Sequence, residues 1–341
     1  MKHKILALAL VGAFGAAQAQ SSVVIYGTVD QGLTKRTDTT TSIGKRDNNK
    51  LGFKGVEDLG DGLKATFQLE IRYDADTGIV EGNGARPLFQ GESRVGLQGA
   101  FGWVRVGRGL TALMASVDAF DPYSGLPSTE GFKADLLVAG YTSDPLSAAG
   151  NSGNRFSNAI FYNSPEFAGF QLNTTIGTKE ANSGPALIGR GTAALPQYIA
   201  NAEATVNPYS VSATYKNGPG SLIFATERNA VETKLVLVGA ALNASDALKL
   251  TALYSRQDQD HTKLTNPKTK AWVVGANYVM GANKFIVGYG QKNPDGVVKT
   301  KEASLGYEYS LSKRTYLYVD ASNKKAATGI NYYNLGIHHN F

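Results

Sequence analysis

Eight basic side chains are the residues of this sequence with the clearest capacity for selective chemistry. Most of them fall on alternate positions of the first half of the chain, and two flank a long irregular segment. They are Lys50, Lys54, Lys64, Arg72, Arg94, Arg105, Arg108 and Arg155. The irregular segment carries the carboxylates Asp118, Asp121, Glu130 and Asp135. Opposed rows of charge on a low-dielectric wall focus an electric field, so this pattern predicts selection among small polar ions.

The balance of these charges favours anions. Of the acidic residues, only Asp30 and Glu70 share the predicted faces of the basic row, so the excess is positive. Asp118 and Asp121 are the first choices for the facing acidic row, and Glu130 and Asp135 are the second. Any one of these charges could simply be a solvated residue of a wall or rim. The hypothesis therefore rests on the group, and it is a weak preference for anions.

Residues for other chemistry are sparse. The chain has no Cys, which excludes disulfides, thiol nucleophiles and Cys-based metal sites. Beyond the first residues it has His261, His338 and His339, from which neither a Ser-His-Asp triad nor a His-rich metal site can be assembled. The acidic stretch 258–261 is better explained as a solvated loop than as a cation site. We therefore expect no enzyme, no metal and no cofactor.

Strands must position the charges, because apolar and polar residues alternate with a period of two from Val23 onward. The stretch 63–73 is the clearest case, since Leu, Ala, Phe, Leu, Ile and Tyr alternate with Lys, Thr, Gln, Glu and Arg. Sixteen such segments can be counted: 23–35, 50–57, 63–73, 93–99, 102–108, 158–163, 170–178, 208–216, 221–228, 233–243, 248–257, 270–279, 284–291, 301–310, 315–321 and 331–341.

The connections between these segments alternate in length. Tight turns rich in Gly, Asn and Asp, such as 58–62 and 217–220, alternate with mostly longer polar stretches such as 36–49 and 179–207. A water-soluble sandwich gives no reason for this alternation, whereas a barrel threaded across a membrane does. We therefore predict an all-β fold, a sixteen-stranded antiparallel transmembrane β-barrel wide enough for an aqueous channel. The mean hydropathy of −0.20 is compatible with such a barrel, because apolar lipid-facing residues alternate with polar lumen-facing residues and the average stays low.

The segment 109–154 breaks the rhythm of short strands. Connections of this length are uncommon unless they are functional or disordered, and Phe120, Tyr123 and Phe132 make this one too apolar for a flexible linker. A turn of helix is expected between Leu110 and Val117. We expect the segment to fold inward and pack against the inside of the barrel wall.

The first 19 residues have the features of a cleaved signal peptide. Lys2 and Lys4 precede an apolar run, and the stretch 17–19 reads Ala-Gln-Ala. The apolar run is too short for a membrane anchor. Residues 20–341 are then a single barrel domain with 28 acidic and, after loss of two lysines from 34 basic residues, 32 basic residues. This mild excess is spread singly, so nucleic acid is not an expected partner.

Six stretches of the sequence match a known family in order and at both ends of the mature chain. They are SSVVIYGTVD (21–30), LGFKGVEDLGDGLKATFQLE (51–70), VGLQGAFGWVRVGR (95–108), NAIFYNSPEFAGF (158–170), GYEYSLSKRTYLY (306–318) and GIHHNF (336–341). In these the chain resembles the trimeric general-diffusion porins of Gram-negative outer membranes, in the branch common among β-proteobacteria. The resemblance implies a homotrimer whose third extracellular loop folds into the lumen at mid-height, and 109–154 occupies the position of that loop, so it is expected to be the constriction loop.

The resemblance also bears on single residues. Lys50 stands where the family carries an arginine before its LGFKG motif, which keeps the charge but loses the planar fork of a guanidinium group. Arg155 resembles the basic residue ahead of NAIFYNSP, and Arg94 stands where many relatives have an aromatic residue. The carboxy-terminal Phe341, on a strand of period two, is expected to be an assembly signal.

The expected function is a passive outer-membrane channel for small hydrophilic solutes and ions. Expected partners are outer-membrane lipid and lipopolysaccharide, the barrel-assembly machinery acting on the last strand, and permeant inorganic and organic ions. A solute-specific channel, a plugged structural or adhesin barrel, and a barrel enzyme are the alternatives. Bilayer conductance and an esterase assay distinguish them.

Overall fold

The computed structural model describes residues 22–82, 84, 86–127, 131–145, 152–178, 186–187, 198–199, 206–258 and 268–341. The predicted signal peptide, Glu130 and His261 lie outside these residues. Within them, no helix has both the length and the apolar character needed to cross a membrane.

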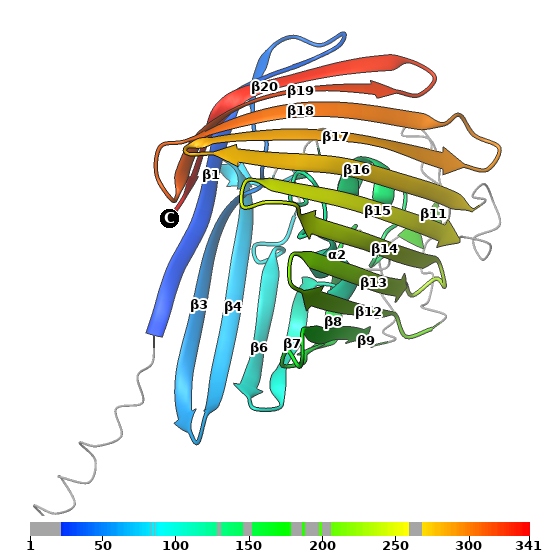
Figure 1. The fold of residues 1–341 in the computed structure, drawn as a ribbon. Coiled ribbons are helices and arrows are strands. Elements are labelled where there is room, and N and C mark those ends of the chain that lie inside the picture. The colour runs from blue at the N-terminus through cyan, green and yellow to red at the C-terminus, as the bar shows by residue number, and fades with distance from the viewer. Residues whose placement is uncertain are drawn as a thin grey trace, which may run out of the picture.

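Sixteen long strands dominate the described part of the chain (Figure 1). They are β1 (Ser22–Arg36), β3 (Asn49–Gly60), β4 (Leu63–Asp74), β6 (Glu92–Gly99), β7 (Gly102–Leu110), β8 (Arg155–Asn163), β9 (Phe170–Gly177), β12 (Tyr209–Asn217), β13 (Gly220–Arg228), β14 (Lys234–Asn243), β15 (Leu248–Asp258), β16 (Thr269–Met280), β17 (Asn283–Pro294), β18 (Thr300–Ser310), β19 (Thr315–Lys325) and β20 (Gly329–Asn340). Each overlaps one predicted segment, so the prediction of sixteen strands is confirmed. The short strands are β2 (Ser42–Gly44), β5 (Ile79–Val80), β10 (Ala186–Leu187) and β11 (Tyr198–Ile199).

The strands close into an antiparallel barrel. Each long strand pairs with its neighbours in the chain, and β1 joins the two ends of the sheet. Residues 22–28 of β1 pair with β3, and residues 28–36 pair with β20. Phe341 completes the closure, because its backbone N–H and C=O exchange hydrogen bonds with Gly27 at 3.1 and 3.2 Å. Closure leaves none of the sixteen long strands of the described residues at a sheet edge, as a barrel in lipid requires.

Alternation along each strand separates an exposed apolar face from a polar one. On β14, Leu235 and Leu237 are fully buried whereas Val236 and Val238 are about two-fifths exposed. On β12, Ser210 and Ser212 are buried, whereas on β1 Val23 and Ile25 are more than half exposed. An apolar face turned outward is the pattern of a wall in contact with lipid. The opposite face is polar except where it packs on apolar residues of the segment 109–154, as Leu235 and Leu237 do, and it is called the polar face below.

Tight turns connect the strands at one end of the barrel. At Gly60, Asp61 and Gly62 all three residues have positive φ, of 89°, 51° and 77°. Glycine adopts this backbone region without the steric cost that other residues bear, which explains its place at such a turn.

The segment between β7 and β8 contains the helices of the described residues. The helix α2 (Ala112–Val117) begins at Thr111, whose hydroxyl accepts a hydrogen bond from the Met114 N–H at 3.3 Å. This confirms the predicted helical turn. The second helix, η1 (Lys133–Leu137), is one turn of π-helix. α2 packs on β9, β12 and β13, and η1 packs on β15, β16 and β17.

Candidate functional site

Five arginines from β4, β6, β7 and β8 form the basic cluster: Arg72, Arg94, Arg105, Arg108 and Arg155. Their neighbours hold the guanidinium groups in place. Arg105 lies 3.8 Å from the centre of the Trp103 ring and hydrogen-bonds Asn163. Arg94 donates to Gln68 Oε1 at 3.0 Å and lies over the Phe161 ring at 5.3 Å.

Arg108 and Arg155 join the cluster to the backbone. Arg155 is 5% exposed, and its Nε donates to the Gly91 carbonyl at 2.5 Å. Arg108 donates to the Gln90 carbonyl at 2.9 Å and to Ser157 Oγ at 2.6 Å. Side chains held by several hydrogen bonds lose little further freedom when an ion approaches, so their charge is preorganised.

Two buried carboxylates belong to the same cluster. Glu92 Oε2 lies 2.9 Å from Arg94 Nε, and Glu70 Oε1 lies 3.4 Å from Arg72 Nε. Both carboxylates are less than 7% exposed. Five arginines against two glutamates leave an excess of three positive charges. Glu92 was missed in the sequence analysis because its segment was predicted to begin one residue later, at Ser93.

The predicted lysines of β3 and β4 differ in their surroundings. Lys54 is exposed, with its ammonium nitrogen 5.2 Å from the centre of the Tyr26 ring. Lys50 is half-buried and pairs in register with Arg72 on β4. Lys64 is exposed beside the turn at Gly62.

The carboxylates of the segment differ in their surroundings. Asp118 is one-third exposed and forms an ion pair with Lys133 of the same segment. Asp121 is 1% exposed, and its Oδ2 accepts a hydrogen bond from the Gly125 N–H at 2.8 Å. Burial raises the pKa of Asp121 to about 6, against the hydrogen bonds from backbone N–H groups that lower it. Asp121 therefore supports a turn inside the segment.

Asp135 pairs across to the barrel, because its Oδ2 lies 2.6 Å from the Lys324 ammonium on β19. Glu130 lies outside the described residues. A constriction role for these four carboxylates stays a prediction. The geometry favours Asp118 and Asp135, whose side chains are partly exposed, over the buried Asp121.

Hydrogen bonds from strand side chains fix the segment to the polar face. Glu227 on β13 is fully buried and accepts from Thr111 Oγ1 at 2.5 Å. Ser255 on β15 donates to the Leu137 carbonyl at 2.7 Å, and Asn277 on β16 donates to the Pro122 carbonyl at 2.9 Å. Backbone groups that would otherwise be buried without partners are satisfied in this way.

Glycines on the polar face make room for the apolar side chains of the segment. A Cβ at Gly288 would lie 2.2 Å from the Phe132 ring, and one at Gly275 would lie 2.2 Å from Pro122. At Gly290 a Cβ would lie 2.5 Å from Leu136. Only glycine permits this close approach. We call Gly275, Gly288 and Gly290 the glycine seat.

A buried charged group near the barrel closure was missed altogether. Arg46, between β2 and β3, is 1% exposed and forms ion pairs with Glu308 at 2.5 Å and Asp320 at 3.2 Å. Its guanidinium carbon also lies 4.7 Å from the centre of the Tyr318 ring. No local sequence pattern predicts this group, because closure alone brings β18 and β19 beside the β2–β3 connection.

Among the described residues, no group of three or more His, Cys, Asp or Glu side chains is arranged to hold a metal ion. His338 Nδ1 lies 3.0 Å from Asp30 Oδ2, and Tyr318 donates to the same carboxylate at 2.7 Å. These contacts place His338 in the closure between β1, β19 and β20.

Comparison with known proteins shows the family to which this chain belongs. The Gram-negative porin family model matches residues 7–328. The outer membrane porin protein 32 of Delftia acidovorans is 32% identical over 96% of this chain and 92% of its own. The major outer membrane protein P.IB of Neisseria lactamica is 30% identical over 94% of this chain and 93% of its own.

Solved structures agree on the fold. The anion-selective porin from Comamonas acidovorans superposes with a TM-score of 0.76 at 24% identity, over 94% of this chain and all of that one. A structure of OmpT from Vibrio cholerae, described as a trimer form, superposes with a TM-score of 0.65 at 15% identity, over 94% of this chain and 99% of its own. The chain therefore belongs to the Gram-negative porin family, and it is an integral outer-membrane β-barrel that serves passive diffusion of small hydrophilic solutes.

Proposed function

We propose that this porin conducts small hydrophilic solutes with a weak preference for anions. The observation that carries the proposal is the basic cluster, in which five arginines face two glutamates. Fixed positive charge on the wall of a narrow aqueous path raises the local concentration of anions and lowers that of cations. The channel needs no cofactor and no catalytic residue for this function.

The segment 109–154 is proposed to narrow the pore. Its support is the set of hydrogen bonds and glycine contacts that hold it on the polar face, across from a wall that carries the basic cluster. Asp118 and Asp135, each of which is paired with a lysine, are the carboxylates proposed to face the arginines, and opposed charges of this kind create a transverse field. Such a field favours small ions over apolar solutes of equal size.

We propose a homotrimer as the working assembly, as the family resemblance implies. Residues 1–19 are proposed to be the cleaved leader, and Phe341 the signal read by the assembly machinery. The lipid partners are phospholipid and lipopolysaccharide, in contact with the exposed apolar face.

The reversal potential in a tenfold gradient of potassium chloride tests the selectivity. We expect the sign that corresponds to greater chloride permeability. Greater potassium permeability would contradict the proposed preference. Absence of conductance would instead favour a plugged structural barrel.

Channel openings in steps of three in planar bilayers would support the trimer.

Removal of residues 112–144 tests the constriction: conductance should rise, provided that the barrel still shows heat-modifiable migration in gels. Unchanged conductance in a folded barrel would rule out a constriction role for the segment.

A further inference from the structure

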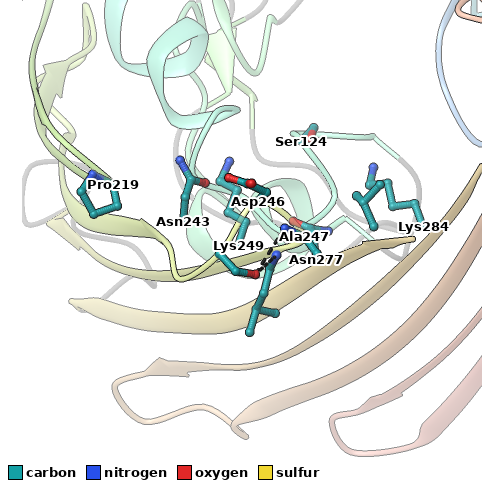
Figure 2. A pocket seen from close by; sticks show the side chains of 11 residues that line it. Ser124, Pro219, Asn243, Asp246, Ala247, Lys249, Asn277 and Lys284 are labelled. Carbon is teal, nitrogen blue, oxygen red and sulfur yellow. Dashed lines mark hydrogen bonds between the residues drawn. The ribbon is translucent and has the colours of Figure 1, made fainter. Parts of the chain in front are cut away.

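A cavity of about 700 Å³ lies on the polar face near the tight turns (Figure 2). Its walls come from β15, β16, β17 and the β14–β15 turn, and Ser124 of the segment between β7 and β8 also lines it. Figure 2 shows Asn243, Lys249, Asn277 and Lys284 arranged around this hollow. The basic cluster contributes no residue to it.

The alternation of the strands places these side chains on the polar face. Lys249 occupies the same face of β15 as Thr251 and Leu253, which are buried, whereas Leu250 is exposed. Lys284 occupies the same face of β17 as the buried Ile286. The lysines are therefore turned away from the lipid.

Both lysines are anchored yet keep free hydrogen-bonding capacity. The Lys249 ammonium donates to the Ala119 carbonyl at 2.7 Å, and the Lys284 ammonium lies 3.1 Å from Glu308 Oε2. An ammonium group has three donors, so one contact leaves others for a ligand. Glu308 also forms an ion pair with Arg46, so its negative charge neutralises the Lys284 ammonium only in part. Asp246 is the carboxylate among the residues that line the cavity.

A second cavity, of about 460 Å³, continues the first because both are lined by Asn243 and Lys249. It adds Lys216 of β12, and its lining contains no carboxylate. A third, of about 330 Å³, shares Asn163 and Asn173 with the second and reaches Arg94 and Arg105. The positive charge thus continues from the basic cluster along the polar face to the far wall.

We propose that Lys216, Lys249 and Lys284 form a second anion site at the tight-turn mouth of the channel, which binds small oxyanions of two or more charges. The proposal rests on the proposed anion preference of the pore. Lys249 and Lys284 stand two strands apart and are offset by two residues in register, so their backbones are roughly 12 Å apart at the usual strand dimensions. A solute with two or three separated carboxylates can contact both ammonium groups, whereas a monovalent ion contacts one. The site concentrates polyvalent anions before or after they pass the constriction.

The test uses citrate as the polyvalent probe and acetate as the monovalent one. Chloride conductance of the full-length protein is measured in planar bilayers at low ionic strength, where screening is weak. The probe is added to each side in turn. We expect citrate to reduce conductance at lower concentration from the tight-turn side than from the other side, and acetate to have little effect.

Substitutions assign the effect to residues. In the double variant Lys249→Gln and Lys284→Gln the half-blocking citrate concentration should rise about tenfold. Lys249→Arg keeps the charge and should retain the block. Lys313→Gln is the matched control, because Lys313 is an exposed lysine in a tight turn outside the cavity lining.

Two results would overturn the site: a double variant blocked as strongly as the parent, or a Lys313→Gln variant that weakens the block equally. The reversal potential, measured in the same bilayers, separates this failure from that of the proposed function. If anion preference persists while the block is unchanged, the second site alone is wrong.

Discussion

The two walls of this barrel hold their functional parts by different means. On β4 to β8, hydrogen bonds, ion pairs and ring contacts hold the five arginine side chains, of which Arg72, Arg94 and Arg108 are partly accessible and Arg105 and Arg155 are buried. On β15 to β17, the glycine seat and apolar contacts hold a chain segment against the strands. The first wall keeps charge near water, and the second wall excludes water beneath the segment. The position of the charges and the position of the segment can therefore be changed separately.

The largest expected effect comes from filling the glycine seat. Gly288→Val places atoms where the Phe132 ring now lies, since even a Cβ would be 2.2 Å from it. Overpacking of this kind costs roughly 1–3 kcal/mol or more, so the segment should leave the wall. We expect a higher single-channel conductance and faster proteolysis within 109–154. Gly329→Val is the control, because its nearest neighbouring atom lies 4.0 Å from the Cβ position. Equal behaviour of the two variants would show that the seat does not hold the segment.

The pH dependence of the segment is the next effect. The pKa of Asp121 is about 6 in the folded protein against 3.8 in its ordinary state, so the folded protein binds the proton more tightly than the unfolded chain. Stability of the segment should therefore fall as the pH rises from 4 to 6, by about 3 kcal/mol at most. The stability change can be measured from the hydrogen exchange of the Gly125 amide, which donates to Asp121, between pH 4 and 6. Asp121→Asn should flatten the profile, and a profile unchanged by this substitution would count against the assignment.

The strands and the closure could be predicted from the sequence, whereas the contacts within the site could not. Period-two alternation is a local property, so each of the sixteen strands overlaps its predicted segment. Arg46 and Glu308 are 262 residues apart and meet only after closure. Asp121 looked like a facing charge because sequence does not reveal the burial of its turn. Lys216, Lys249 and Lys284 lie on predicted alternating faces, but the sequence does not show that the cavities beside them join the three side chains along one wall.

A smaller effect is expected at the start of α2. Thr111 caps the helix and donates to Glu227, so Thr111→Val removes both interactions. Loss of such a cap costs about 1–2 kcal/mol. A double-mutant cycle with Glu227→Gln should give a coupling free energy of about 1 kcal/mol, measured from proteolysis rates of the segment. Additive effects would mean that the two side chains do not depend on each other.

The smallest effect concerns the geometry of the basic wall. Arg105→Lys keeps the charge but loses the planar group that stacks on Trp103 at 3.8 Å. The ammonium group is then free to move, and the ratio of chloride to potassium permeability should fall by about a factor of two. Arg105→Gln, which also removes the charge, should lower the ratio further. If the lysine variant has the same permeability ratio as the parent, the charge at position 105 alone determines the selectivity of this wall. If the lysine variant has the same permeability ratio as the glutamine variant, the charge acts on ions only from the stacked position of the guanidinium group. Proteolysis of 109–154 should be unchanged in both variants, because this wall does not carry the seat of the segment.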